Sequence, residues 1–241
     1  MQVFIYKNAE EIARAASMIF AAEILKKPDC VIGLATGSTP IPTYQQLIKL
    51  NREGVIDFSK VRSYNLDEYI GLPETHDQSY RYFMNDNLFN HINIDKANTQ
   101  VPCGIGADHA ADAAHYDEMI EAAGGIDIQV LGIGNNGHIG FNEPAEVFIR
   151  GTHVVDLTES TIDANKRFFA NRDDVPRQAI TLGMGGIMGA KKVIMLAFGK
   201  GKAEAVRDMI KGEIDPKMPA SILQLHKDVT LLIDEEAASL L

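Results

Sequence analysis

The sequence has few cysteines and no long apolar run. Its two cysteines, Cys30 and Cys103, lie far apart, which excludes a disulfide framework, and no closely spaced cysteines indicate a zinc site. No apolar stretch approaches the roughly 20 residues that a membrane-spanning helix needs. The first residues lack the charged-then-apolar layout of a signal peptide. We therefore expect a cytoplasmic protein with no bound metal.

Basic residues are outnumbered by acidic ones, 23 against 33, so that the formal net charge is -10. Such a surface repels nucleic acid and anionic membranes, and we expect neither as a partner. A small anionic substrate remains compatible with this charge, because a few well-aimed donors can form a positive pocket. No low-complexity linker or internal repeat interrupts the 241 residues, so we expect one domain over 1–241.

Apolar runs alternate with amphipathic segments along the whole chain. This pattern predicts a doubly wound, mostly parallel α/β sheet of Rossmann-like type with helices on both faces. We expect strands at 3–6, 30–35, 61–66, 126–131, 152–157, 192–198 and 229–233. We expect helices at 8–27, 40–50, 79–91, 108–123, 158–170, 183–189, 202–210 and 221–225. Because ligands of such sheets bind beyond the carboxyl ends of the strands, the loops after four of these strands should meet at one edge.

The loop after strand 30–35 reads Thr36-Gly-Ser-Thr-Pro40 and leads into a helix. Gly37 permits a tight turn, and the hydroxyls of Ser38 and Thr39 stand at a helix N-terminus, which is a ready anion site. The alternative is plain helix capping by these hydroxyls. The loop lacks the Gly-Lys-Ser/Thr of a Walker motif, so ATP chemistry is not indicated.

Asp67 stands where the strand 61–66 ends, a place where parallel sheets present catalytic groups. A partly buried carboxylate there can act as a base, whereas Glu68 points elsewhere if the strand continues. The alternative for Asp67 is the capping of a turn.

The loop after strand 126–131 contains glycines at 132, 134, 137 and 140, together with His138 and Glu143. If Glu143 accepts a hydrogen bond from one ring nitrogen, the other nitrogen is oriented to carry a proton. The alternative is a flexible surface connection. Arg167 and Lys202 could clamp a phosphate, although each could also be a solvated surface charge.

These groups together fit proton abstraction next to a masked carbonyl of a sugar phosphate, preceded by ring opening. No cofactor motif is present, so we expect no cofactor. The residues alone do not identify the sugar.

The chain resembles the glucosamine-6-phosphate deaminase (isomerase) family along nearly its whole length. Five stretches carry the resemblance: Gly33–Pro40 (GLATGSTP), Asn65–Tyr69 (NLDEY), Gly132–Pro144 (GIGNNGHIGFNEP), Ala164–Phe169 (ANKRFF) and Ser221–His226 (SILQLH). The resemblance implies the conversion of glucosamine 6-phosphate and water to fructose 6-phosphate and ammonia, without a cofactor.

The resemblance also implies roles for individual residues. His138, oriented by Glu143, would open the pyranose ring, and Asp67 would move a proton from carbon 2 to carbon 1. Gly37, Ser38, Thr39, Arg167 and Lys202 would hold the 6-phosphate.

The chain departs from the family pattern in two respects. Many members have aspartate in place of Asn136, so the imidazolium form of His138 should be less stabilised here and the acid limb of the pH profile shifted. The chain also lacks the C-terminal extension of the allosteric hexameric members, and segment 145–155 has only Arg150 as a basic residue. We therefore expect hyperbolic kinetics without an acetylated sugar-phosphate activator, and a monomer or small homo-oligomer. Segment 145–170 is a candidate mobile lid because it follows the catalytic loop.

Three alternatives stay open. Two are enzymes on a related scaffold, a 6-phosphogluconolactonase or another sugar-phosphate isomerase. The third is a non-catalytic sugar-phosphate sensor, although no basic helix-turn-helix flanks the domain.

Overall fold

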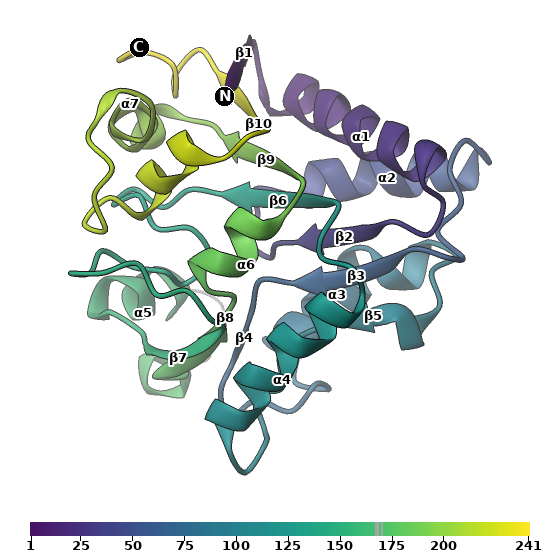
Figure 1. Ribbon diagram of the computed structural model, residues 1–241, viewed down its shortest axis with the longest axis horizontal. Helices are drawn as coiled ribbons and strands as arrows, with labels where there is room; N and C mark the ends of the chain where they lie inside the picture. The colour runs from purple at the N-terminus through teal and green to yellow at the C-terminus, as the bar shows by residue number, and fades with distance from the viewer. Residues whose placement is uncertain (167–168, 170) are drawn as a thin grey trace.

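A seven-stranded parallel sheet forms the centre of the computed structural model, which describes residues 1–166, 169 and 171–241. The strand order is β1-β10-β9-β6-β2-β3-β5, and every neighbouring pair is parallel (Figure 1). The strands are β1 Gln2–Tyr6, β2 Val31–Leu34, β3 Arg62–Asn65, β5 Thr99–Gln100, β6 Ile128–Gly132, β9 Lys192–Ala197 and β10 Val229–Asp234. The sequence prediction of a mostly parallel sheet is confirmed.

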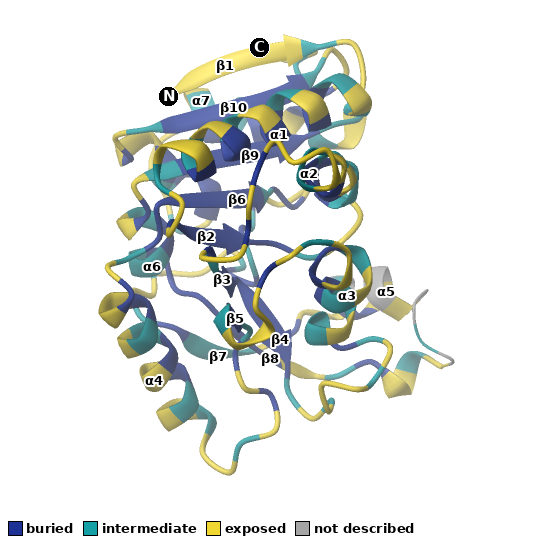
Figure 2. Cartoon of the chain, turned by 90° about the vertical axis from the view of Figure 1, so that its right-hand side faces the viewer, coloured by how far each residue is buried: buried dark blue, intermediate teal, exposed yellow. Residues whose placement is uncertain are grey.

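Helices cover both faces of this sheet, as Figure 2 shows for α2 and α3 on one side and α4 and α6 on the other. The helices are α1 Ala9–Lys26, α2 Ile41–Arg52, α3 Tyr80–Asn87, α4 His109–Ala122, α5 Glu159–Asn165, α6 Met184–Gly189 and α7 Ala203–Lys211. Short 3₁₀ turns lie at η1 Phe89–His91, η2 Lys96–Asn98, η4 Arg172–Asp174, η5 Lys200–Lys202 and η6 Pro219–Leu225.

Because helices cover both faces of the sheet, the side chains on both faces of a central strand are buried, and the strands are apolar without interruption. All residues of β2 are buried, as are Val229 to Ile233 of β10. Asn8 caps α1 by accepting a hydrogen bond from the Glu11 backbone N–H, as expected for its residue type. In the described part of the chain, no helix combines the length and apolar character that a membrane crossing requires.

A second sheet, of three antiparallel strands, was not predicted. It has the order β4-β8-β7 and consists of β4 Asp67–Tyr69, β8 Gln178–Thr181 and β7 His153–Asp156. The strand predicted at 61–66 was expected to end at Asp67; instead the chain continues after Leu66 into β4, which pairs with β8. This pairing holds Asp67 opposite Thr181 in a regular strand.

Two helix predictions also need correction. The helix expected at 79–91 breaks at Leu88, where α3 ends and the separate turn η1 begins. The helix expected at 158–170 is described as α5 as far as Asn165, and Arg167 lies outside the described residues.

The strand order reverses between β2 and β6. From β2 the chain proceeds to β3 and β5 on one side, and from β6 to β9 and β10 on the other. The carboxyl ends of neighbouring parallel strands diverge at such a point and leave a crevice. The loops that carry the candidate site residues open at this crevice.

Candidate active site

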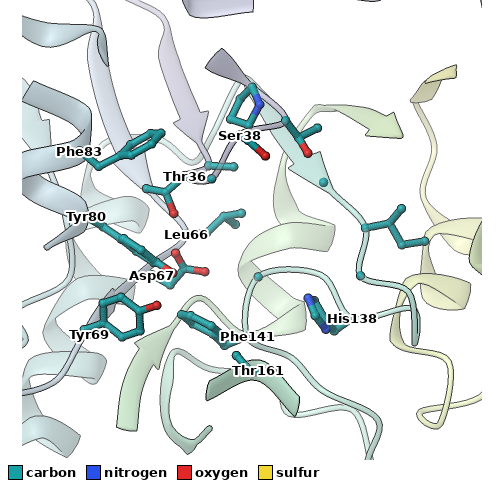
Figure 3. A pocket seen from close by; sticks show the side chains of 18 of the residues that line it. Thr36, Ser38, Leu66, Asp67, Tyr69, Tyr80, Phe83, His138, Phe141 and Thr161 are labelled. Atoms are coloured by element: carbon teal, nitrogen blue, oxygen red, sulfur yellow. The ribbon is translucent and has the colours of Figure 1, made fainter. Parts of the chain in front are cut away.

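A cavity of about 630 Å³ occupies the crevice between the ends of β2, β3 and β6. Its size suits a phosphorylated hexose, since ligand pockets usually measure roughly 300–1,000 Å³. Figure 3 shows the labelled side chains of Ser38, Asp67 and His138 around this one space. The structure therefore brings together predicted site residues from three separate segments of the chain. The predicted site residues that line the cavity are Gly37, Ser38, Thr39, Asp67, Asn136, His138 and Lys202.

The loop from Thr36 to Pro40 forms one wall of the cavity. Gly37 has a φ of 89°, a left-handed conformation that glycine adopts without strain. The loop is tied to α2 by the buried Tyr44, whose hydroxyl donates to the Ala35 carbonyl at 2.6 Å and accepts from the Ala35 N–H at 3.1 Å. Sequence reasoning missed Tyr44, because a tyrosine one turn inside a helix carries no signal of this contact.

The hydroxyls of Ser38 and Thr39 do not cap the following helix. Pro40 occupies the N-cap position of α2, and no side chain makes the capping hydrogen bond there. This observation disfavours the plain capping alternative. The N-terminus of α2 and both hydroxyls are thus available to an anion in the cavity.

Lys202 approaches the same cavity from the turn η5, which follows β9. Burial lowers the pKa of its amine, and among the described residues no carboxylate pairs with it. A partly buried ammonium without a protein counter-ion is a favourable partner for a phosphate. Arg167, the other predicted phosphate ligand, lies outside the described residues.

Asp67 is buried on the floor of the cavity, with 6% of its surface exposed. Burial, reinforced by the nearby charge of Glu68, raises the pKa of Asp67 to about 8. A carboxylate with a pKa near neutrality can accept a proton from carbon and later return it. The geometry therefore favours the base over the turn-capping alternative.

Glu68 faces away from the cavity, as the alternation of a strand predicts. Its carboxylate accepts hydrogen bonds from the N–H groups of Tyr69, Tyr80 and Arg81, at 2.8 to 2.9 Å. Two of these groups belong to the first turn of α3, where a negative charge also stabilises the helix dipole. Glu68 thus fixes the start of α3, which places Tyr80 beside Asp67 in the cavity wall.

Aromatic side chains complete the wall on this side. Tyr80 and Phe141 stack with their ring planes 9° apart and their centroids 6.1 Å apart, and Tyr69 lies 4.7 Å from Tyr80. These rings line the cavity together with Asp67 and contribute to the apolar surroundings of its carboxylate. No pattern in the sequence indicated a role for these rings.

The glycines of the loop after β6 make room for the histidine. A Cβ atom on Gly134 would lie 2.4 to 2.6 Å from three ring atoms of His138, so only glycine permits the ring to lie there. Gly137 has a φ of 84°, and its Cβ position is occupied by the sulfur of Met218. The loop is further held by the Gly134 N–H, which donates to the His138 carbonyl at 2.9 Å.

His138 and Glu143 form the pair that the sequence predicts. The Nδ1 atom of His138 lies 3.3 Å from Oε1 of Glu143, and His138 lines the cavity. The other ring nitrogen is therefore the one available to a substrate. This defined geometry disfavours the flexible-connection alternative.

Two further side chains hold the Glu143 carboxylate. Asn136 donates to Oε2 at 2.6 Å, and Thr161 of α5 donates to Oε1 at 2.8 Å. Burial acts to raise the pKa of Glu143, but the nearby His138 ring and the hydrogen bonds from Asn136 and Thr161 outweigh it and keep the pKa below its usual value. The carboxylate is thus ionised and fixed beside the ring. Sequence reasoning missed Thr161, which carries no local signal.

Comparison with known proteins gives a consistent result. A family model described as glucosamine-6-phosphate isomerases/6-phosphogluconolactonase matches residues 6–232. The chain is 56% identical to a glucosamine-6-phosphate deaminase of Clostridium perfringens (strain 13 / Type A) over 241 residues, 100% of both chains. It is 52% identical to a glucosamine-6-phosphate deaminase of Clostridioides difficile (strain 630), over 99% of this chain and 96% of the relative.

Two solved structures have the same fold as this chain. A monomeric glucosamine-6-phosphate deaminase superposes with a TM-score of 0.97 at 46% identity, covering 100% of both chains. A 6-phosphogluconolactonase from Trypanosoma cruzi superposes with a TM-score of 0.77 at 20% identity, covering 99% of this chain and 96% of that one. The second likeness shows a common fold alone.

Proposed function

The chain belongs to the family of glucosamine-6-phosphate isomerases and 6-phosphogluconolactonases, and we infer that within it the protein acts as a glucosamine-6-phosphate deaminase. It converts glucosamine 6-phosphate and water to fructose 6-phosphate and ammonia, a step of amino sugar catabolism. The observation that carries this assignment is the buried Asp67 in one cavity with the His138–Glu143 pair. Hydrolysis of a lactone requires no proton transfer at carbon, whereas the isomerisation requires a base such as Asp67.

Ring opening is the first step that these residues can perform. The free nitrogen of His138 takes the proton of the anomeric hydroxyl, the bond between carbon 1 and the ring oxygen breaks, and the proton passes to that oxygen. Glu143 stabilises the transient imidazolium because its carboxylate lies 3.3 Å from Nδ1. The product of this step is the open-chain aldehyde.

Asp67 then carries out the isomerisation. Its carboxylate removes the proton from carbon 2 of the open-chain substrate, whose amine is an ammonium group, and one ammonium proton passes to the oxygen on carbon 1. The product is an enol with a hydroxyl on carbon 1 and a neutral amine on carbon 2. Return of the proton to carbon 1 leaves a protonated imine at carbon 2. Water adds to this carbon, ammonia leaves, and the ketone of fructose 6-phosphate remains. The pKa of about 8 suits a group that must both accept and donate this proton.

The phosphate is held at the opposite wall. The N-terminus of α2, the hydroxyls of Ser38 and Thr39, and the Lys202 amine face the cavity there. Arg167 is proposed as a further phosphate ligand from the family resemblance.

Ammonia release from glucosamine 6-phosphate tests the function directly. We expect release by the wild type and a loss of roughly 10²- to 10⁴-fold in Asp67→Asn, because the general base is removed. In heavy water, the wild type should exchange the hydrogen at carbon 2 and the variant should not. Hydrolysis of 6-phosphogluconolactone without ammonia release would instead support the lactonase alternative, and binding without turnover would support a sensor.

The protein is further proposed to work in the cytoplasm as a monomer or small homo-oligomer with hyperbolic kinetics. The similarity to a monomeric deaminase supports this assembly state. Sedimentation at working concentration tests it. A sigmoidal rate curve that an acetylated sugar phosphate makes hyperbolic would contradict the absence of an activator.

A further inference from the structure

Thr161 lies at the contact between α5 and the glycine-rich catalytic loop. It is the third residue of α5, and its side chain lines the cavity beside the loop (Figure 3). Its hydroxyl donates a hydrogen bond outside α5, to Oε1 of Glu143 at 2.8 Å. Oε1 is the same oxygen that faces Nδ1 of His138 at 3.3 Å.

The hydroxyl is itself held in place. Thr158, the N-cap of α5, accepts a hydrogen bond from the Thr161 N–H at 3.2 Å and donates its own hydroxyl to the Thr161 oxygen at 3.0 Å. Because the Thr161 oxygen already accepts a hydrogen bond from the Thr158 hydroxyl, the proton of the Thr161 hydroxyl is directed to Glu143. Hydrogen bonds therefore join Thr158, Thr161 and Glu143, and the Glu143 oxygen at the end of this series lies 3.3 Å from Nδ1 of His138.

The two oxygens of Glu143 are held from two different parts of the chain. Asn136, in the catalytic loop, holds Oε2 at 2.6 Å, whereas Thr161, in α5, holds Oε1. With only the Asn136 contact, the carboxylate could rotate about its last bond and withdraw Oε1 from the ring. Thr161 supplies the second point that fixes the plane of the carboxylate.

We propose that Thr161 is a positioning residue for ring opening, which holds the Glu143 carboxylate in the plane from which it orients the His138 ring. The proposal rests on the ring-opening role of the His138–Glu143 pair given above. It assigns Thr161 no part in the step at carbon 2, because the hydrogen bonds of Thr161 join it to Thr158 and Glu143.

The test compares Thr161→Val, which replaces the hydroxyl by a methyl group of similar size, with Thr161→Ser, which keeps the hydroxyl. We expect kcat for ammonia release to fall about 10- to 50-fold in the valine variant, as for loss of a hydrogen bond to a charged group. The serine variant should stay within about threefold of the wild type. Thr161→Ala serves as a second hydroxyl-free variant if Thr161→Val does not fold, as judged by circular dichroism and thermal unfolding.

Two readouts separate positioning from a merely structural role. Substrate deuterated at carbon 2 should show a smaller isotope effect on kcat in Thr161→Val than in the wild type, because ring opening becomes slower than proton abstraction. The acid limb of the kcat profile should also move to higher pH, because the Glu143 carboxylate, which His138 faces, loses a stabilising donor.

The outcomes are distinct. An unchanged kcat and isotope effect in the folded Thr161→Val or Thr161→Ala variant would overturn the proposal, as would a serine variant as impaired as the valine variant. A wild type that releases no ammonia would contradict the proposed function instead.

Discussion

The Nδ2 atom of Asn136 lies 2.6 Å from Oε2 of Glu143, so this side chain contacts the carboxylate that pairs with His138. Its own oxygen accepts a hydrogen bond from the His138 backbone N–H at 3.2 Å. The sequence predicts that asparagine at this position stabilises the imidazolium form of His138 less than aspartate would. The structure adds that its amide is a donor to Glu143, a contact that an ionised aspartate could not make.

We predict that Asn136→Asp moves the acid limb of the kcat profile to higher pH. The new carboxylate would lie beside Glu143, and two like charges at this distance raise the pKa of the pair. The form with Glu143 ionised therefore requires a higher pH. Asn136→Ser, which removes the amide donor without adding a charge, is the control and should move the limb less, and an acid limb that stays in place in Asn136→Asp would refute the prediction.

Asp67→Asn should increase the free energy of unfolding at high pH, although it lowers the activity. The pKa of Asp67 is about 8 in the folded state and about 4 in the unfolded chain. Between these pH values the carboxyl ionises in the unfolded chain but not in the folded protein, so the wild type loses stability as the pH rises through this range. Asparagine avoids this loss. We expect a gain in the free energy of unfolding on the order of 5 kcal/mol at pH 9, since about four pKa units are worth roughly 1.4 kcal/mol each, and this gain should disappear near pH 4.

Urea denaturation at both pH values measures this difference. The exposed Asp86→Asn serves as control and should show no pH-dependent gain. Equal stability of wild type and Asp67→Asn at pH 9 would show that the carboxyl ionises freely in the folded state.

Gly134→Ala should reduce kcat about 100-fold without unfolding the protein, since a displacement on the order of 1 Å at a catalytic group has this effect. The added methyl would meet the His138 ring at 2.4 to 2.6 Å and push it away from Glu143. Gly189→Ala, at a position with open space around the Cβ, is the matched control. An active Gly134→Ala enzyme would show that His138 functions in another position.

Lys202→Ala should raise KM for glucosamine 6-phosphate roughly 10- to 100-fold, because a charge-assisted contact with the phosphate is lost. The rate with unphosphorylated glucosamine, however low, should not change. Lys200→Ala, an exposed lysine of the same turn, should behave like the wild type. The prediction is wrong if both lysine variants have the same KM.

Segment 145–170 is predicted to act as a lid whose susceptibility to protease falls when a sugar phosphate binds. Thr161 and Phe169 of this segment line the cavity, so a bound ligand would contact it directly. Time courses of limited proteolysis with and without fructose 6-phosphate measure the effect, and unphosphorylated fructose is the control. Equal cleavage rates under all three conditions would count against a lid.

Much of the fold could be predicted because its determinants are local. A run such as Cys30 to Ala35 is apolar throughout only when both faces of a strand are covered, which indicates a parallel sheet. Parallel strands share one carboxyl edge, so the loops that carry Asp67 and His138 could be expected to meet. The antiparallel sheet was missed because β4 pairs with β8, more than 100 residues further along the chain, and no local pattern encodes that partner.

The sequence by itself determined which groups stand at the edge of the sheet: the glycine turns, the hydroxyls of the anion loop, Asp67, and His138 with Glu143. Only the tertiary structure decided what each group meets there. Aromatic rings on α3 and on the catalytic loop contribute to the apolar surroundings that raise the pKa of Asp67, and the hydroxyl that fixes Glu143 comes from α5. Strand and turn propensities act over a few residues, whereas burial and hydrogen-bond partners depend on segments that meet only after the chain has folded.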